Sequence, residues 1–171
     1  MIYKAFFDGA CFLRHCGIGY VIRDWNGESL YRAGKYVGYG DALKAEYFAL
    51  LLLLQRLNSM GIARVVVHGD SRTVVQQING LVATRPRNRF LGFIETTKRM
   101  FSLHPGWVLK WVPRQENGMA DALATESLNG VRMSHKKGRG KNINSLWLID
   151  EYELASWNKA VEPNRTAAPI L

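Results

Sequence analysis

Residues 64–70, with the sequence RVVVHGD, decide the fold class of this chain. The three consecutive valines are β-branched and favour an extended strand, and so short an apolar run is typical of a strand in the middle of a sheet. The run ends at Gly69, and an acidic residue, Asp70, follows at once. A helical pattern occupies residues 71–79 directly afterwards, so the segment predicts a strand-to-helix unit of an α/β sheet.

Upstream of this strand, the sequence predicts three further strands and one long helix. Residues 2–8, 17–24 and 29–37 have strand patterns, and an Asn26-Gly27 turn joins the last two. We therefore expect these three strands to form an antiparallel meander. Asp41 can cap a helix that runs to about residue 60, with Gly61 just past its end.

Downstream, the pattern predicts helices at residues 90–103 and 117–128 and one more strand at residues 107–112. Trp107, Leu109 and Trp111 alternate along that strand, so we expect them on one face, in the core. The element order is βββαβααβα. It predicts a mixed five-stranded sheet whose first three strands are antiparallel and whose faces carry helices, a single α/β domain over residues 1–128.

Positive charge is in excess over the whole chain and gathers after this domain. The 171 residues carry a formal net charge of +9, which indicates either a polyanionic partner such as nucleic acid or a generally basic surface. Residues 129–141 hold no acid and three glycines, so they are predicted to be a flexible basic linker. We expect the tail, residues 129–171, to dock back through Trp147 and Trp157. The basic residues of the linker, whose charges either bind phosphates or stay idle, are Arg132, Lys136, Lys137, Arg139 and Lys141.

The two cysteines, Cys11 and Cys16, are too few for a disulfide framework and have no partners at zinc-ligand spacing. We therefore expect reduced thiols with a structural role in a cytoplasmic protein. The sequence contains no run of 18 or more apolar residues and no signal-peptide pattern at its start, so no membrane contact is expected. A monomer is the expected state.

Four carboxylates fall at informative places in the predicted elements. Asp8 ends a predicted strand and Asp70 directly follows another, and Glu46 and Asp121 lie on or beside apolar, alanine-flanked helix faces. Each of the four could instead have a purely structural role. Asp8 could start a turn, Asp70 could cap a helix, and backbone groups could satisfy the carboxylates of Glu46 and Asp121. Together they would repel one another, and a hard divalent cation with oxygen ligands resolves that repulsion. The set therefore predicts a metal site.

The residues around these acids form an ordered set of short motifs over residues 2–128. The sequence resembles type 1 ribonuclease H, most closely its bacterial, archaeal and plant-like branch. The resemblance lies in the order of the motifs rather than in any one of them. The motifs are Phe7-Asp8-Gly9, Gly17-Ile18-Gly19, Ala45-Glu46, Gly69-Asp70-Ser71, Val74-Val75, Ile78-Asn79-Gly80, the run WVPRQEN at 111–117 and Ala120-Asp121-Ala122-Leu123-Ala124.

The resemblance implies a ribonuclease H fold and an endonuclease that cuts the RNA strand of RNA–DNA hybrids, leaving 5′-phosphate and 3′-hydroxyl ends. Two Mg²⁺ ions, about 4 Å apart and replaceable by Mn²⁺, would clamp the attacking water and the leaving oxygen. By resemblance, Asp8 bridges both ions, and Asp70 and Asp121 hold the ion that activates water. Glu46 then binds the second ion and contacts the ribose 2′-hydroxyl, the group that distinguishes RNA from DNA.

Three features depart from the commonest pattern of that family. Many members carry a histidine in the loop before the last acid, where this chain has Arg114, Gln115 and Asn117; the plant-like branch typically lacks it too. Ala42 and Leu43 stand where a pair of asparagines often precedes the helix glutamate. The long basic protrusion of some members is absent. The basic cluster that could replace it, or could be a solvated loop, is Arg85, Arg87 and Arg89.

The expected contacts with substrate come mainly from basic side chains near the acids. We predict substrate contacts from Gly9, Ser71, Arg72, Arg85, Arg87, Arg89, Arg114, Asn117, Arg132, Lys136, Lys137 and Arg139. The alternative function is a non-catalytic nucleic-acid-binding module with the same fold, although such a module need not keep four costly acids. A proofreading exonuclease would have an acid at Ala10, and an integrase-like enzyme would have glutamate in place of Asp121.

Overall fold

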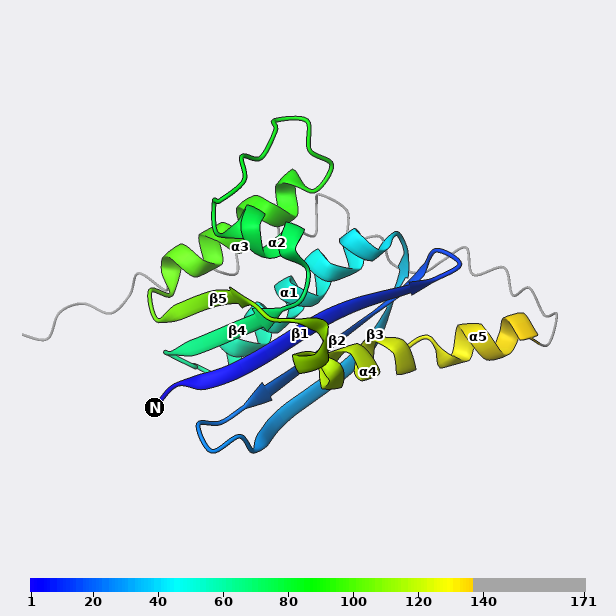
Figure 1. The fold of residues 1–171 in the computed structure, drawn as a ribbon, viewed down its shortest axis with the longest axis horizontal. Coiled ribbons are helices and arrows are strands. Elements are labelled where there is room, and N and C mark those ends of the chain that lie inside the picture. The colour runs from blue at the N-terminus through cyan, green and yellow to red at the C-terminus, as the bar shows by residue number, and fades with distance from the viewer. Residues whose placement is uncertain (137–171) are drawn as a thin grey trace, which may run out of the picture.

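The computed structural model describes residues 1–136, which form a mixed five-stranded sheet with helices on both faces (Figure 1). The strand order is β3-β2-β1-β4-β5; β1, β2 and β3 are antiparallel, and β1, β4 and β5 are parallel. This confirms the predicted α/β fold. The elements are β1 (Tyr3–Phe12), β2 (His15–Arg23), β3 (Ser29–Tyr39), α1 (Ala42–Ser59), β4 (Val65–Gly69), α2 (Arg72–Ile78), α3 (Leu91–Leu103), β5 (Trp107–Trp111), the 3₁₀ helix η1 (Arg114–Glu116), α4 (Gly118–Glu126) and α5 (Asn129–Lys136).

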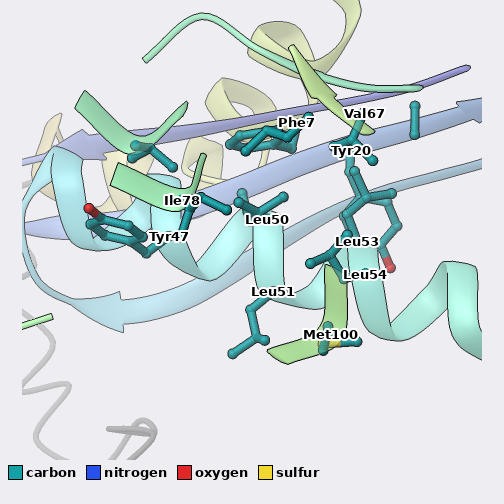
Figure 2. Close-up of a cluster of buried hydrophobic side chains, with 14 of the residues drawn as sticks. Phe7, Tyr20, Tyr47, Leu50, Leu51, Leu53, Leu54, Val67, Ile78 and Met100 are labelled. Carbon is teal, nitrogen blue, oxygen red and sulfur yellow. The ribbon is translucent and has the colours of Figure 1, made fainter. Parts of the chain in front are cut away.

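The core lies between the sheet and α1, whose apolar run 47–54 is buried almost throughout. Figure 2 shows Leu50 and Leu54 of this helix against Phe7 of β1 and Val67 of β4. All four side chains are completely buried. The helix begins and ends as the sequence predicts: the Asp41 side chain accepts a hydrogen bond from the Lys44 amide, and Gly61 has a φ of 66° just past the end.

The hairpin between β1 and β2 is longer than the sequence indicates. Its turn residues, Leu13 and Arg14, have φ values of 48° and 65°, a conformation usually signalled by asparagine or glycine. Because that signal is missing, the sequence pattern predicts a strand that ends at Asp8. The carboxylate instead lies in the middle of β1, opposite Gly19, and just beyond the last parallel pair of β1 with β4, Phe6 with His68.

This longer hairpin places Cys11 directly opposite Cys16. Their Cα atoms are 4.1 Å apart, and the two sulfurs form a disulfide. The prediction of two reduced thiols is therefore wrong. Spacing alone could not reveal the pairing, because it depends on the register of a hairpin whose turn has no sequence signal.

The prediction of a flexible linker from residue 129 is also wrong as far as residue 136, because residues 129–136 form α5. The helix packs on the end of β1: the Arg132 guanidinium lies 5.3 Å from the centroid of the Phe12 ring, and the His135 ring lies 6.0 Å from it. The expected docking of the tail through Trp147 and Trp157 falls outside the described residues. Within residues 1–136, no helix is long and apolar enough to cross a membrane.

The two tryptophans of β5, Trp107 and Trp111, differ in burial. Trp107 is 4% exposed and its indole N–H donates to the Ile62 carbonyl, so its place in the core is confirmed. Trp111 is 40% exposed, and the prediction of a core position is wrong. At the end of β5 its ring meets the start of α2, where the Arg72 guanidinium lies 4.3 Å from the ring centroid.

α4 packs on the face of the sheet opposite α1 and touches β2 at glycines. A Cβ added to Gly19 would come 2.2 Å from the Ala120 carbonyl oxygen and 2.5 Å from the Ala124 nitrogen. We expect Gly19→Ala to destabilise the fold by roughly 1–3 kcal/mol, because a backbone contact cannot give way cheaply. Thermal unfolding checks this. Gly118→Ala, whose Cβ meets nothing within 4 Å, is the control and should leave the melting temperature unchanged or slightly raised; equal effects of both variants would contradict the packing argument.

Candidate active site

Three carboxylates from three elements converge at one edge of the sheet. Oxygens of Asp8 on β1, Glu46 on α1 and Asp70 after β4 all lie within 4.8 Å of one another. Asp8 is 4% exposed and Glu46 9%. Because β1 and β4 are parallel neighbours, the residues beyond their last shared pair meet at the same edge. The geometry thus brings together three of the four predicted acids.

A glycine permits the close approach of α1 to β1 at this point. A Cβ on Gly9 would lie 2.4 Å from the Ala45 carbonyl carbon and 2.5 Å from the Glu46 nitrogen. Any larger residue at position 9 would push the helix away from the strand. Gly9, for which a substrate contact is predicted, has a structural role here, since its missing side chain lets Glu46 approach Asp8.

The structure excludes the two purely structural roles that the sequence allows for Asp8 and Asp70. Asp8 lies within a strand rather than at a turn, and its Oδ1 accepts the Gly9 amide at 3.0 Å. Ser71, not Asp70, caps α2: its hydroxyl accepts the Val74 amide at 3.5 Å. Asp8 therefore does not start a turn and Asp70 does not cap a helix, so neither structural role accounts for these carboxylates.

Burial and mutual repulsion raise the pKa values of two carboxyl groups in this cluster, Asp8 and Glu46. Burial raises the pKa of Asp8 to about 7, with a further rise from the negative charge of Asp70 and a partly opposing hydrogen bond with Glu46. The pKa of Glu46 is raised well above its usual value, first by burial and then by the charge of Asp8. The Glu46 Oε2 atom is buried and has no hydrogen-bond partner. A buried, unpaired oxygen among three carboxylates is a donor set that fits a divalent cation.

Asp121 stands beside this cluster rather than within it. It lies in the first turn of α4, with its side chain 33% exposed, and its Oδ1 accepts a hydrogen bond from Arg114 Nη2 at 3.3 Å. Its negative charge still contributes to the raised pKa of Asp8. The fourth predicted acid is therefore near enough to act on the cluster, although it does not belong to the group of three.

The predicted substrate-binding residues are found in different surroundings. Arg72 and Arg114 are exposed beside the acids, Arg85 and Arg87 are exposed on the segment between α2 and α3, and Lys136 is exposed at the end of α5. Arg89 forms an ion pair with Asp41 at 2.5 Å. Ser71 and Arg132 are occupied by the cap and the ring contact described above. Lys137, Arg139 and Lys141 lie outside the described residues.

Asn117 does not face solvent, so its predicted contact with substrate is wrong. The side chain is 1% exposed, and its Nδ2 donates to the Phe7 carbonyl at 2.8 Å. The residue joins the start of α4 to the strand that carries Asp8. Local sequence patterns carry no signal for this hydrogen bond, because the two partners are 110 residues apart.

A cavity of about 540 Å³ lies elsewhere, between α1 and the outer strands β2 and β3. Its lining includes Tyr20, Tyr31 and Arg56 but none of the four acids. Arg56 Nη2 donates to the Tyr31 hydroxyl at 2.9 Å, so two of its polar groups satisfy each other. The open, carboxylate-lined edge of the sheet, rather than this cavity, is the candidate site.

The fold and the carboxylate cluster together define a ribonuclease H-like protein. Residues 6–127 match the reverse transcriptase-like family, and the chain belongs to that family. It is 28% identical over 127 residues to ribonuclease HI of Halobacterium salinarum, covering 73% of this chain and 63% of the relative. The chain thus spans less than two thirds of that curated relative.

Solved structures agree with this assignment and confirm the resemblance that the motifs indicate. RNase H1 from Halobacterium salinarum is 29% identical with a TM-score of 0.66, covering 76% of this chain and 99% of the other. LC11-RNase H1 in complex with an RNA/DNA hybrid is 26% identical with a TM-score of 0.70, at the same coverage. The N-terminal RNase H domain of a Mycobacterium tuberculosis protein is 23% identical with a TM-score of 0.72, over 78% of this chain and 98% of the other, and supports the fold alone.

Proposed function

We propose that this chain is a metal-dependent endonuclease that hydrolyses the RNA strand of RNA–DNA hybrids. The observation that carries the proposal is the cluster of Asp8, Glu46 and Asp70, with one buried oxygen of Glu46 unpaired. The similarity to LC11-RNase H1, a protein solved with an RNA/DNA hybrid, supports the substrate class. The net charge of +9 suits a polyanionic partner.

The carboxylate cluster supports binding of a divalent cation, and we propose that two Mg²⁺ ions, replaceable by Mn²⁺, would bind there. When bound, such ions activate a water molecule and stabilise the leaving oxygen of a phosphodiester, which yields 5′-phosphate and 3′-hydroxyl ends. Asp8, the most central carboxylate, would bind both ions, and Asp70 and Asp121 would bind the one beside the attacking water. Glu46 would bind the other and accept a hydrogen bond from the ribose 2′-hydroxyl of the scissile strand.

Exposed arginines near the carboxylate cluster would bind the phosphates of the substrate. Arg72 and Arg114 flank the acids and would bind the phosphates next to the cut, and Arg85 and Arg87 would bind those of the DNA strand. Arg114 already pairs with Asp121, so it can leave that carboxylate for a phosphate when a metal ion takes its place. We further propose that basic side chains of residues 129–141 contact substrate phosphates. We also propose a monomeric protein with no membrane partner.

Cleavage assays separate the proposed function from a non-catalytic nucleic-acid-binding module of the same fold. A labelled RNA–DNA hybrid should be cut in Mg²⁺ and left intact in EDTA, and double-stranded RNA and double-stranded DNA should stay intact in both. The gain in RNA-strand fragments over time is the measurement. Binding of the hybrid without any metal-dependent cleavage would favour the binding module instead.

Glu46→Gln is expected to impair cleavage strongly, and by an amount that depends on the sugar at the cut. The substitution removes both the charge that binds a cation and the strong acceptor for the 2′-hydroxyl. Cleavage rates on an all-RNA strand and on the same strand with a single 2′-deoxynucleotide at the cut, each paired with DNA, isolate the contact with the 2′-hydroxyl. A loss that is the same for both substrates would mean that Glu46 only binds metal.

A further inference from the structure

The segment 111–117, which joins β5 to α4, contacts the chain beside several of the acids. At its start, the Trp111 indole N–H donates to the backbone carbonyl of Asp70 at 2.9 Å. The next amide, that of Val112, donates to the Gly69 carbonyl at 3.0 Å. The end of β4 and the first residue after it are thus held from one side by two consecutive residues of this segment.

The other end of the segment holds β1. Asn117 Nδ2 donates to the carbonyl of Phe7, the residue before Asp8, at 2.8 Å, and this contact is buried. The Asn117 carbonyl also accepts the Asp121 amide at 3.1 Å, so the same residue begins the helix that carries the fourth acid. Asn117 therefore links the backbones of two acid-bearing elements.

Between these ends the segment is bonded to itself and forms η1. The Glu116 amide donates to the Pro113 carbonyl at 2.9 Å, and the Asn117 amide donates to the Arg114 carbonyl at 3.0 Å. Pro113 adds a fixed φ. A short, internally bonded span with anchors at both ends keeps those anchors at a constant separation.

We propose that segment 111–117 is a positioning brace for the carboxylate cluster, with Trp111 and Asn117 as its two positioning residues. Both bonds go to backbone carbonyls, so they fix Asp70 and Asp8 in place and leave the carboxylate oxygens for metal. Without such support, like charges in one buried site push apart. The brace acts on metal affinity, and its effect on cleavage rests on the proposed function.

Groups that orient metal ligands typically change metal affinity about 10–100-fold when removed. The test uses two substitutions that remove one donor each: Trp111→Phe, which keeps an aromatic ring under Arg72, and Asn117→Leu, which keeps the size of a buried side chain. Gln115→Ala, an exposed residue of the same segment, is the matched control. Mn²⁺ binding without nucleic acid is measured by calorimetry, with Asp8→Asn as the variant that lacks the site.

Each brace variant is expected to bind Mn²⁺ about tenfold more weakly, and Gln115→Ala as the wild type does. In cleavage assays the Mg²⁺ midpoint should rise by a similar factor, whereas KM for the hybrid at saturating Mg²⁺ should change little. Unchanged Mn²⁺ affinity in a folded Trp111→Phe protein would overturn the brace, even if Asn117→Leu fails to fold. A raised KM at unchanged metal affinity would also overturn it, in favour of a substrate contact. Should the wild type bind Mn²⁺ but cut no hybrid, the proposed function fails while the calorimetry still tests the brace.

Discussion

Asp8→Asn is expected to lower hybrid cleavage at least about a thousandfold, comparable to removing a main electrostatic stabiliser of a transition state. The carboxylate is 4% exposed and shares a site with Glu46 and Asp70, so its charge is central to any cation held there. An amide oxygen of the same size is a poor substitute ligand. The measurement is the single-turnover rate of RNA-strand cleavage at saturating Mg²⁺, and Asp70→Asn should behave in the same way.

The control for this experiment is Glu95→Gln, which removes one carboxylate charge from an exposed position on α3. It should cut at the wild-type rate. A circular dichroism spectrum like that of the wild type establishes that the Asp8→Asn protein is folded. Turnover close to the wild-type rate in that folded variant would refute the assignment of the site.

The sequence predicts the sheet well because its signals are local. Three consecutive valines, the Asn26-Gly27 turn and the Asp41 cap each act within a few residues, and each lies where the structure has it. The hairpin end of β1 was missed because Leu13 and Arg14 adopt positive φ without the usual residues. α5 was missed because its basic residues and Gly130 are typical of a linker. Its packing against Phe12 is a long-range contact that the local sequence does not indicate.

The acidic residues of the candidate site could be predicted from the sequence, but the hydrogen bonds around them could not. Asp8 and Asp70 lie at the ends of predicted strands and Glu46 on an apolar helix face, so a shared metal site could be inferred from the sequence and its family resemblance. The roles of Trp111 and Asn117 could not, since hydrogen bonds over 41 and 110 residues leave no trace in local pattern. Alternation placed Trp111 in the core because periodicity cannot tell where the covering helices end.

Asp8→Asn should also make the metal-free protein more stable at neutral pH, although it destroys the proposed activity. Burial and the neighbouring charge of Asp70 raise the pKa of Asp8 from 3.8 to about 7 in the folded chain. The folded state therefore binds a proton between these values that the unfolded state has released, and stability falls as the pH rises through that interval. At about 1.4 kcal/mol per pH unit, the penalty at neutral pH is on the order of 4 kcal/mol.

Asparagine carries no charge, so the variant avoids this penalty. In EDTA, its melting temperature should match that of the wild type near pH 4 and exceed it progressively, by on the order of 10 °C, as the pH approaches and passes 7. The charge of Asp8 also helps to raise the pKa of Glu46, so the difference between the two proteins reports on both buried carboxylates, whereas carboxylates away from the cluster cancel. Saturating Mg²⁺ should raise the wild type far more than the variant, because binding to the folded state alone is stabilising. A difference in melting temperature that stays constant from pH 4 to pH 8 would mean that the Asp8 carboxylate carries no buried, unpaired charge at neutral pH, and the electrostatic basis of the metal site would then be lost.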